Sequence, residues 1–189
     1  MPRPLVPDRR ERILDAAEAL VLDSGFDAMS VAGVAARAGI GKGAVYLEFD
    51  SKRAILDALL QRGTERLRAR TAAELPRLSD AYRAAVQALL EDQLMTAAFL
   101  DDRGTLGTHV GTVTDGRYHA RHASVVEWLR ALQAQGMLAA DVDPEHLAIA
   151  LSSATIGLLS AARLIGPFTP DQLAGGLDAL ARMAASFEP

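Results

Sequence analysis

The sequence predicts an all-α protein. Half of its 189 residues are hydrophobic and only 5% are aromatic, while Ala, Leu and Arg recur at spacings of three and four along most of the chain. Such spacings place apolar side chains on one face of a helix, whereas no segment shows the alternation that a strand requires. A chain of this length and apolar content can form one large domain or two small ones with substantial cores.

The N-terminal segment predicts a disordered arm followed by a helix. Residues 1–7 contain three prolines, and Asp8 with Glu11 three residues later matches a capping box. Apolar residues then fall on one helical face until Gly25, where we expect the helix to end. The three arginines at its start are interpreted either as a solvated helix end or as contacts to phosphate; they are Arg9, Arg10 and Arg12.

Residues 30–52, SVAGVAARAGIGKGAVYLEFDSK, predict a helix-turn-helix. Ser30 is a good N-cap for a first helix, and Gly39 marks its end. A glycine turn and a second helix of barely two turns follow. This helix carries Lys42 to Tyr46 and should stop near Phe49 and Asp50, after which Ser51 can cap the next helix. Two helices joined by a tight glycine turn can present the second helix to the major groove of DNA.

The remainder of the chain predicts a second helical domain. Pro76 interrupts the helical pattern, so we expect residues 1–50 to form the arm and helix-turn-helix, 51–72 a connecting helix, and 79–189 the second domain. Further helices are predicted at 79–100, 117–135, 145–165 and from 170 onward, starting at caps such as Asp143 and Thr169. The glycine-rich residues 101–116 predict one short helix with loops, either a plain surface loop or a ligand-gated connection.

The helix after Asp143 is apolar nearly all round, which predicts burial on both sides. A symmetry mate would supply the second partner face, so we expect a homodimer built from the last two helices; the alternative is a helix central to a monomer core. The expected interface residues are Ala150, Ala154, Gly157, Ala161, Leu177 and Leu180.

Charge and residue types narrow the classes of function. The net charge is −4, but residues 1–72 hold 12 basic and 10 acidic residues, which fits a DNA-facing end attached to an acidic body. The absence of cysteine and of a signal-peptide pattern fits the reducing cytoplasm. His119 and His122 lack a third placed ligand, and no nucleophile motif or phosphate-binding loop occurs, so no metal, cofactor or enzymatic activity is expected.

Residues 9–60 resemble the DNA-binding domain of the TetR family of transcriptional regulators. The resemblance rests on the entry helix ILDAAEALVLDSGF and on the pattern of residues 30–52. It implies DNA contacts by seven residues, with Tyr46 and Lys52 bonded to phosphates: Ser30, Gly41, Lys42, Gly43, Ala44, Tyr46 and Lys52. Two positions depart from the family. Gly41 lacks a hydroxyl that often caps the recognition helix, and Glu48 is expected to point away from DNA or to accept from a cytosine amino group.

The same resemblance implies that residues 79–189 bind an effector and dimerise. Four residues are candidate walls of a pocket for an apolar or aromatic molecule, although core packing is an alternative for each: Met95, Phe99, Tyr118 and Trp128. We therefore expect a cytoplasmic, dimeric, ligand-responsive repressor that binds a pseudo-palindromic operator on double-stranded DNA. The alternatives are an effector-independent, sequence-nonspecific architectural protein, and an all-α enzyme or carrier with a vestigial helix-turn-helix.

Overall fold

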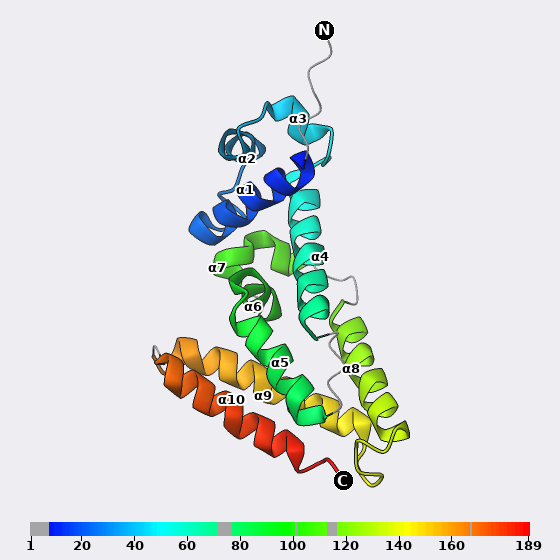
Figure 1. Ribbon diagram of the computed structural model, residues 1–189. Coiled ribbons are helices and arrows are strands. Elements are labelled where there is room, and N and C mark those ends of the chain that lie inside the picture. Colours follow the sequence, from blue (N-terminus) through cyan, green and yellow to red (C-terminus); the bar gives the residue numbers. More distant parts are fainter. Residues whose placement is uncertain (1–7, 72–76, 101, 113–116, 167) are drawn as a thin grey trace. The chain divides into compact units, whose positions relative to one another are not determined.

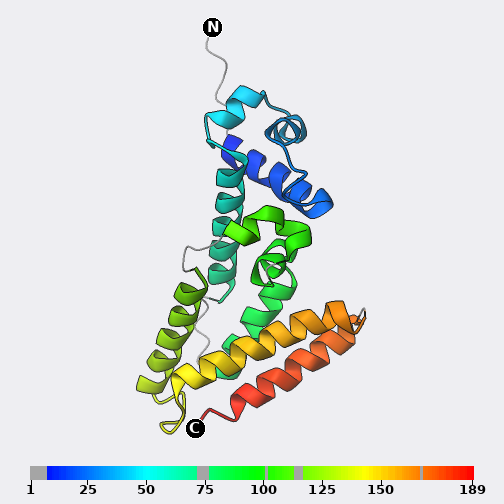
Figure 2. The ribbon, with the colours of Figure 1, turned by 180° about the vertical axis from the view of Figure 1, so that it is seen from behind.

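The computed structural model describes residues 8–71, 77–100, 102–112, 117–166 and 168–189, and every regular element among them is a helix (Figures 1 and 2). The predicted all-α class is thus confirmed. The elements are α1 (Arg9–Ser24), α2 (Val31–Ala38), α3 (Lys42–Tyr46), α4 (Lys52–Thr71), α5 (Leu78–Leu90), α6 (Gln93–Phe99), α7 (Arg103–Leu106), the 3₁₀ helix η1 (Gly107–Thr112), α8 (Arg117–Ala134), α9 (Pro144–Leu164) and α10 (Pro170–Ala185).

The chain forms two compact units that are not contiguous in sequence. The N-terminal unit comprises residues 1–65 together with 93–113, and the C-terminal unit comprises 66–92 together with 114–189. The first boundary falls within α4, close to the predicted connecting helix. The return of α6, α7 and η1 to the N-terminal unit was not anticipated from the sequence.

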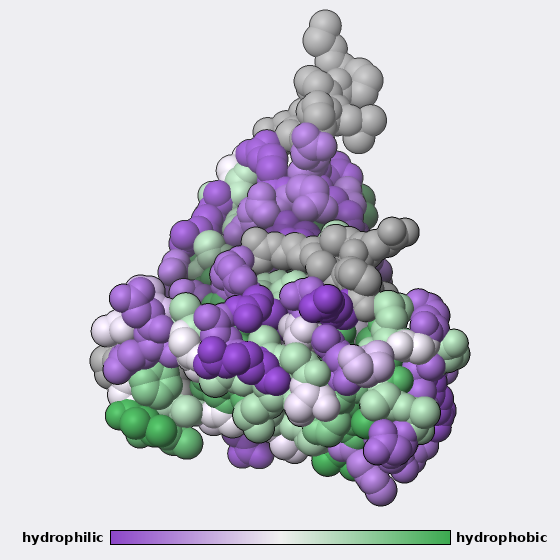
Figure 3. Space-filling model, turned by 60° about the horizontal axis from the view of Figure 1, so that its bottom comes forward, coloured by the Kyte–Doolittle hydropathy of each residue, from purple (hydrophilic) through white to green (hydrophobic). Residues whose placement is uncertain are grey.

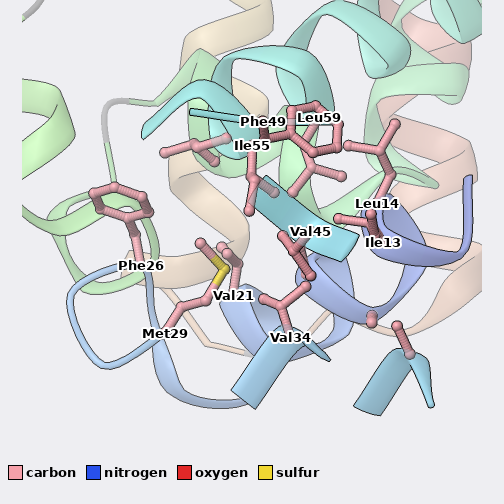
Figure 4. Close-up of a cluster of buried hydrophobic side chains, with 14 of the residues drawn as sticks. Ile13, Leu14, Val21, Phe26, Met29, Val34, Val45, Phe49, Ile55 and Leu59 are labelled. Carbon is pink, nitrogen blue, oxygen red and sulfur yellow. The ribbon is translucent and has the colours of Figure 1, made fainter. Parts of the chain in front are cut away.

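The core of the N-terminal unit joins α1, α2, α3 and α4 in one cluster (Figure 4). Each helix contributes at least one fully buried side chain at its inward-facing positions, and Leu94 of α6 and Leu106 of α7 complete the same cluster. The fully buried members from α1 to α4 are Ile13, Ala17, Val21, Val34, Val45, Ile55, Leu56 and Leu59. The helix-turn-helix is therefore held on an apolar base, which leaves its polar surface outward.

The ends of the helices in this unit follow the predicted capping chemistry with one exception. The Ser30 hydroxyl accepts from the backbone N–H of Gly33 at 3.0 Å, and Ser51 accepts from that of Ala54 at 3.1 Å. Gly39 ends α2 with φ +65°. The predicted capping box at Asp8 is wrong, because Asp8 adopts φ +62° and its side chain makes no capping bond.

The C-terminal unit packs α5 on α10, α8 on α9 and α9 on α10, and the last two helices run side by side in both views (Figures 1 and 2). Among the described residues its core is apolar apart from a hydroxyl pair, in which the oxygens of Tyr82 and Thr155 lie 3.0 Å apart. The predicted caps at Asp143 and Thr169 are present, the latter as a full capping box. The backbone N–H groups of His146 and Glu145 lower the pKa of Asp143, because they stabilise its carboxylate.

The predicted continuous helix over residues 79–100 is wrong, because α5 ends at Leu90 and α6 begins at Gln93. Glu91 and Asp92 stand at the end of α5, where acidic side chains oppose the helix dipole. Asp92 instead accepts a hydrogen bond from Arg66 at 3.0 Å. The break allows the chain to leave the C-terminal unit and to add α6 to the core of the N-terminal unit.

The described part of the chain meets neither the requirements of a membrane-spanning helix nor those of a metal site. None of its helices combines the length and the apolar content that a bilayer crossing requires. Within the same residues, no three His, Cys, Asp or Glu side chains converge as metal ligands would.

Candidate nucleic-acid interface

The short helix α3 presents its polar side to solvent because Val45 anchors the opposite side. Val45 is fully buried, whereas Lys42, Gly43 and Tyr46 are exposed. At the N-cap, Gly41 has extended backbone and contributes no side-chain bond, so only backbone amides are available there, as predicted. The arrangement resembles the exposed second helix that reads DNA in a helix-turn-helix.

An open hollow of about 500 Å³ lies beside α3. Its wall contains four of the predicted DNA-binding residues together with Asp50 and Ser51: Ser30, Lys42, Tyr46 and Lys52. The N-termini of α2 and α4 both open into it through their capping serines. Helix N-termini attract anions through free amides and the helix dipole, so the hollow suits a phosphate despite the Asp50 carboxylate.

Lys42 and Lys52 have different surroundings in this hollow. The Lys42 ammonium is exposed and lies 5.8 Å from the centre of the Tyr46 ring. The Lys52 ammonium instead donates to three backbone carbonyls of the loop before α2, those of Phe26, Asp27 and Met29, at 3.1 to 3.4 Å. Lys52 therefore joins the start of α4 to that loop, and its phosphate contact stays a prediction.

The three arginines at the start of α1 all contact the helix-turn-helix. Arg9 pairs with Glu48 through Nε at 2.9 Å and through Nη2, which accounts for the direction of this carboxylate. The guanidinium of Arg10 lies 4.5 Å from the centre of the Phe49 ring. Arg12 donates to the carbonyl of Ala38 at 2.5 Å. These contacts connect the first turn of α1 to the ends of α2 and α3.

A further contact, missed from the sequence, joins the segment 104–109 to the α1–α2 loop. We call it the Asp27 contact. The Asp27 carboxylate accepts from Thr108, from its hydroxyl at 2.7 Å and from its N–H at 3.2 Å, and these bonds lower the pKa of Asp27. Phe26 N–H donates to the carbonyl of Thr105 at 2.8 Å. His109 is buried beside the Phe26 ring, with Nε2 3.6 Å from Oδ1 of Asp57.

The candidate ligand residues are divided between the units. Met95 and Phe99 belong to the N-terminal unit, where Met95 packs closely over Gly63 of α4. Trp128 packs against the core of the C-terminal unit. The side chains of Tyr118 and His119 lie outside the described residues. A pocket lined by the four predicted residues therefore stays a prediction.

The candidate interface residues lie on α9 and α10 with unequal exposure. Ala150 and Gly157 are exposed, and Ala154, Ala161 and Leu180 are partly buried. Leu177 is buried within the core of its own unit. Large apolar side chains accompany the exposed residues of the two helices: Ile149, Ile156, Leu164 and Met183.

The comparisons with known proteins point to one family. Residues 13–59 match the model of bacterial regulatory proteins of the tetR family. The chain is 41% identical over 64 residues to the HTH-type transcriptional repressor KstR of Mycolicibacterium smegmatis, a match that covers 34% of the chain and 31% of KstR. The chain thus matches about a third of the length of this relative.

Two solved structures are similar over nearly the whole chain. GusR of Salmonella enterica has a TM-score of 0.73 at 24% identity and covers 97% of each chain. NalD, the secondary repressor of the MexAB-OprM multidrug efflux pump in Pseudomonas aeruginosa, has a TM-score of 0.65 at 26% identity and covers 93% of this chain and 94% of its own. The sequence matches concern the DNA-binding region, and the structural matches extend the likeness to the complete fold.

Proposed function

Since the chain belongs to the TetR family of transcriptional regulators, we propose that it is a cytoplasmic, dimeric repressor that binds a pseudo-palindromic operator and is released by a small apolar or aromatic effector. The names of KstR and NalD, both repressors, support repression as the sign of regulation. The observation that carries the proposal is the exposed side of α3 beside a hollow flanked by two helix N-termini.

DNA binding would combine phosphate and base contacts around α3. The capped N-termini of α2 and α4 and the Tyr46 hydroxyl would hold phosphates, and Lys42 would approach the groove from the first turn of α3. Gly43 adds no side chain, so the helix backbone itself can come close to the bases. Phosphate contacts give affinity and position, whereas the side chains that reach base edges give sequence preference.

Dimerisation would use the outward sides of α9 and α10. Figure 3 shows patches of hydrophobic residues among hydrophilic ones on the surface that includes these helices. Gly157 on α9 and Gly175 on α10 have open space where a Cβ would stand, so no contact within this chain requires a glycine at either position. A helical glycine costs roughly 1 kcal/mol relative to alanine, and close approach of a second copy would explain both. A dimer presents two recognition helices to major grooves about 34–36 Å apart.

The effector response needs two states with different affinity for the operator, typically a difference of about 1–3 kcal/mol. An apolar or aromatic molecule is the expected effector, because pockets for small molecules are lined mostly by apolar and aromatic side chains. Trp128 is the single tryptophan of the chain, so its fluorescence reports on binding nearby. Naphthalene and decanoate serve as aromatic and aliphatic probes. We expect one of them to quench this emission saturably and to lower operator affinity; probes that never alter operator affinity would favour the effector-independent alternative.

The DNA-binding proposal is tested by duplex selection from a random library, followed by affinity measurements at fixed salt. A regulator should prefer its selected duplex over a scrambled one by roughly 10³ or more. Lys42→Ala should reduce this preference, whereas Arg130→Ala, which removes one charge from an exposed ion pair of α8 with Glu145, should not. Equal affinity for the two duplexes would instead support a nonspecific architectural protein.

The interface is tested by introducing charge on the outward side of α9. Gly157→Glu should yield monomers in sedimentation velocity, because a carboxylate would be buried unpaired between the two copies. The matched control is Ala131→Glu, at an exposed position on α8. A Gly157→Glu protein that stays dimeric would place the interface on other helices.

A further inference from the structure

Leu47 is the most exposed large apolar residue among the described residues of the N-terminal unit. Its exposure is 75%, compared with 47% for Tyr46 and 39% for Leu22. An exposed leucine on an ordinary surface needs no explanation. This one, however, directly follows the helix that the proposed function places in the major groove.

The backbone around Leu47 fixes the direction of its side chain. Leu47 has helical torsions, and its N–H donates to the carbonyl of Gly43 at 3.2 Å, so the helical path continues through it. Residues two positions apart lie on opposite sides of a helix, and residues four apart lie on the same side. Leu47 and Gly43 therefore both lie opposite the fully buried Val45, at the centre of the outward side of α3.

The residues next to Leu47 leave it as the single protruding group on that line. Gly43, one turn earlier, has no side chain and nothing within 4 Å of the Cβ position. Tyr46 turns toward the hollow beside Lys42. Glu48 is held by Arg9. The outward side of α3 thus presents bare backbone at Gly43 and one large apolar side chain, that of Leu47.

The major groove offers one apolar group at a base edge, the C5 methyl of thymine. We propose that Leu47 is a specificity-determining residue that packs on a thymine methyl group in each half-site of the operator. The inference rests on the proposed function, because it requires α3 to enter the major groove. It adds a defined base preference that neither the charged nor the polar residues of the hollow supply.

The test uses a duplex selected from a random library. Each thymine is replaced in turn by deoxyuridine, which removes only the methyl group, first in one half-site and then at the same position of both, and the affinity is measured each time. Burial of one methyl group corresponds to about a fourfold change in affinity, and therefore about 15-fold when both half-sites are altered. We expect one position to show this loss with the wild-type protein. In Leu47→Ala the loss at that position should disappear, whereas Leu22→Ala, an exposed leucine of α1, should retain it.

The outcomes separate the inference from the proposed function. Wild-type affinity that is indifferent to deoxyuridine at every position of an enriched motif would overturn the role of Leu47 alone. A position that stays equally sensitive in Leu47→Ala would assign the methyl contact to another residue and would also overturn it. A library that yields no enriched motif would overturn the proposed function and the inference together. Because Leu47 is exposed, circular dichroism should show that Leu47→Ala folds normally.

Discussion

Substituting Gly107 by alanine should destabilise the N-terminal unit through a collision at the Asp27 contact. Gly107 has φ +53°, a backbone conformation that alanine adopts only with strain. A Cβ at this position would lie 2.7 Å from Oδ1 of Asp27 and closer still to Cγ and Oδ2. The carboxylate would have to move, although it is held by the N–H and hydroxyl of Thr108.

The magnitude follows from two separable costs. Backbone strain contributes about 1–3 kcal/mol, and the overlap contributes a further 1–3 kcal/mol or so, the usual cost of an overpacked site. Gly39→Ala is a control for positive φ in the same unit, because Gly39 has φ +65° and ψ +35°, the ordinary left-handed conformation, and a Cβ there would meet only a guanidinium nitrogen of Arg12 at 3.3 Å. It should cost the strain alone, about 1–2 kcal/mol.

Urea denaturation followed by far-UV circular dichroism, at one protein concentration, measures both variants. In an Asp27→Ala background the overlap is absent, so Gly107→Ala should then cost its backbone strain alone, about 1–3 kcal/mol. A coupling free energy of roughly 1–3 kcal/mol between the two sites is expected. Equal destabilisation by Gly107→Ala with and without the Asp27 side chain would refute the packing argument.

Three further predictions concern charge and glycine content. The pKa of Asp27 is lowered from 3.8 in the folded state, so its carboxylate stabilises the protein above that pH. The difference in stability between wild type and Asp27→Asn should therefore vanish as acid protonates the folded carboxyl. A difference that grows in acid would contradict this. Glu48→Gln should lower the free energy of unfolding by about 1 kcal/mol, because it weakens the ion pair with Arg9. An unchanged urea midpoint would show that this pair does not stabilise the fold. Gly175→Ala should gain about 1 kcal/mol of helix stability and yet weaken dimerisation in sedimentation equilibrium; a tighter dimer would exclude this glycine from the interface.

The parts of the fold that the sequence predicted are those encoded by local chemistry. Ser30, Ser51, Asp143 and Thr169 cap helices as expected, because an N-cap and its amides lie within three residues. The helix-turn-helix follows from a pattern that repeats over one or two turns. Asp8 shows the weakness of such patterns, since a left-handed backbone there prevents its side chain from capping.

The contacts missed from the sequence join residues far apart in the chain. Arg9 and Glu48 are 39 residues apart, and Asp27 and Thr108 are 81 apart, so no periodicity relates them. The departure of Glu48 from the family pattern was a signal for the first of these contacts, because an acidic residue beside a helix that is expected to approach phosphates favours a nearby cation. The hydrogen bonds from Lys52 to three backbone carbonyls could not be predicted either, because every residue has a carbonyl and its use as an acceptor does not depend on residue type.

The discontinuous N-terminal unit has a consequence for the order of folding during synthesis. Leu94 and Leu106 are almost completely buried in its core, yet the ribosome delivers them long after α3 and α4. Each contributes about 1.5–3 kcal/mol of burial, so a nascent chain that ends near residue 65 holds its helix-turn-helix on an incomplete apolar core. The core of this unit can therefore be completed only after α7 has been synthesised, when α5 of the C-terminal unit has already been made.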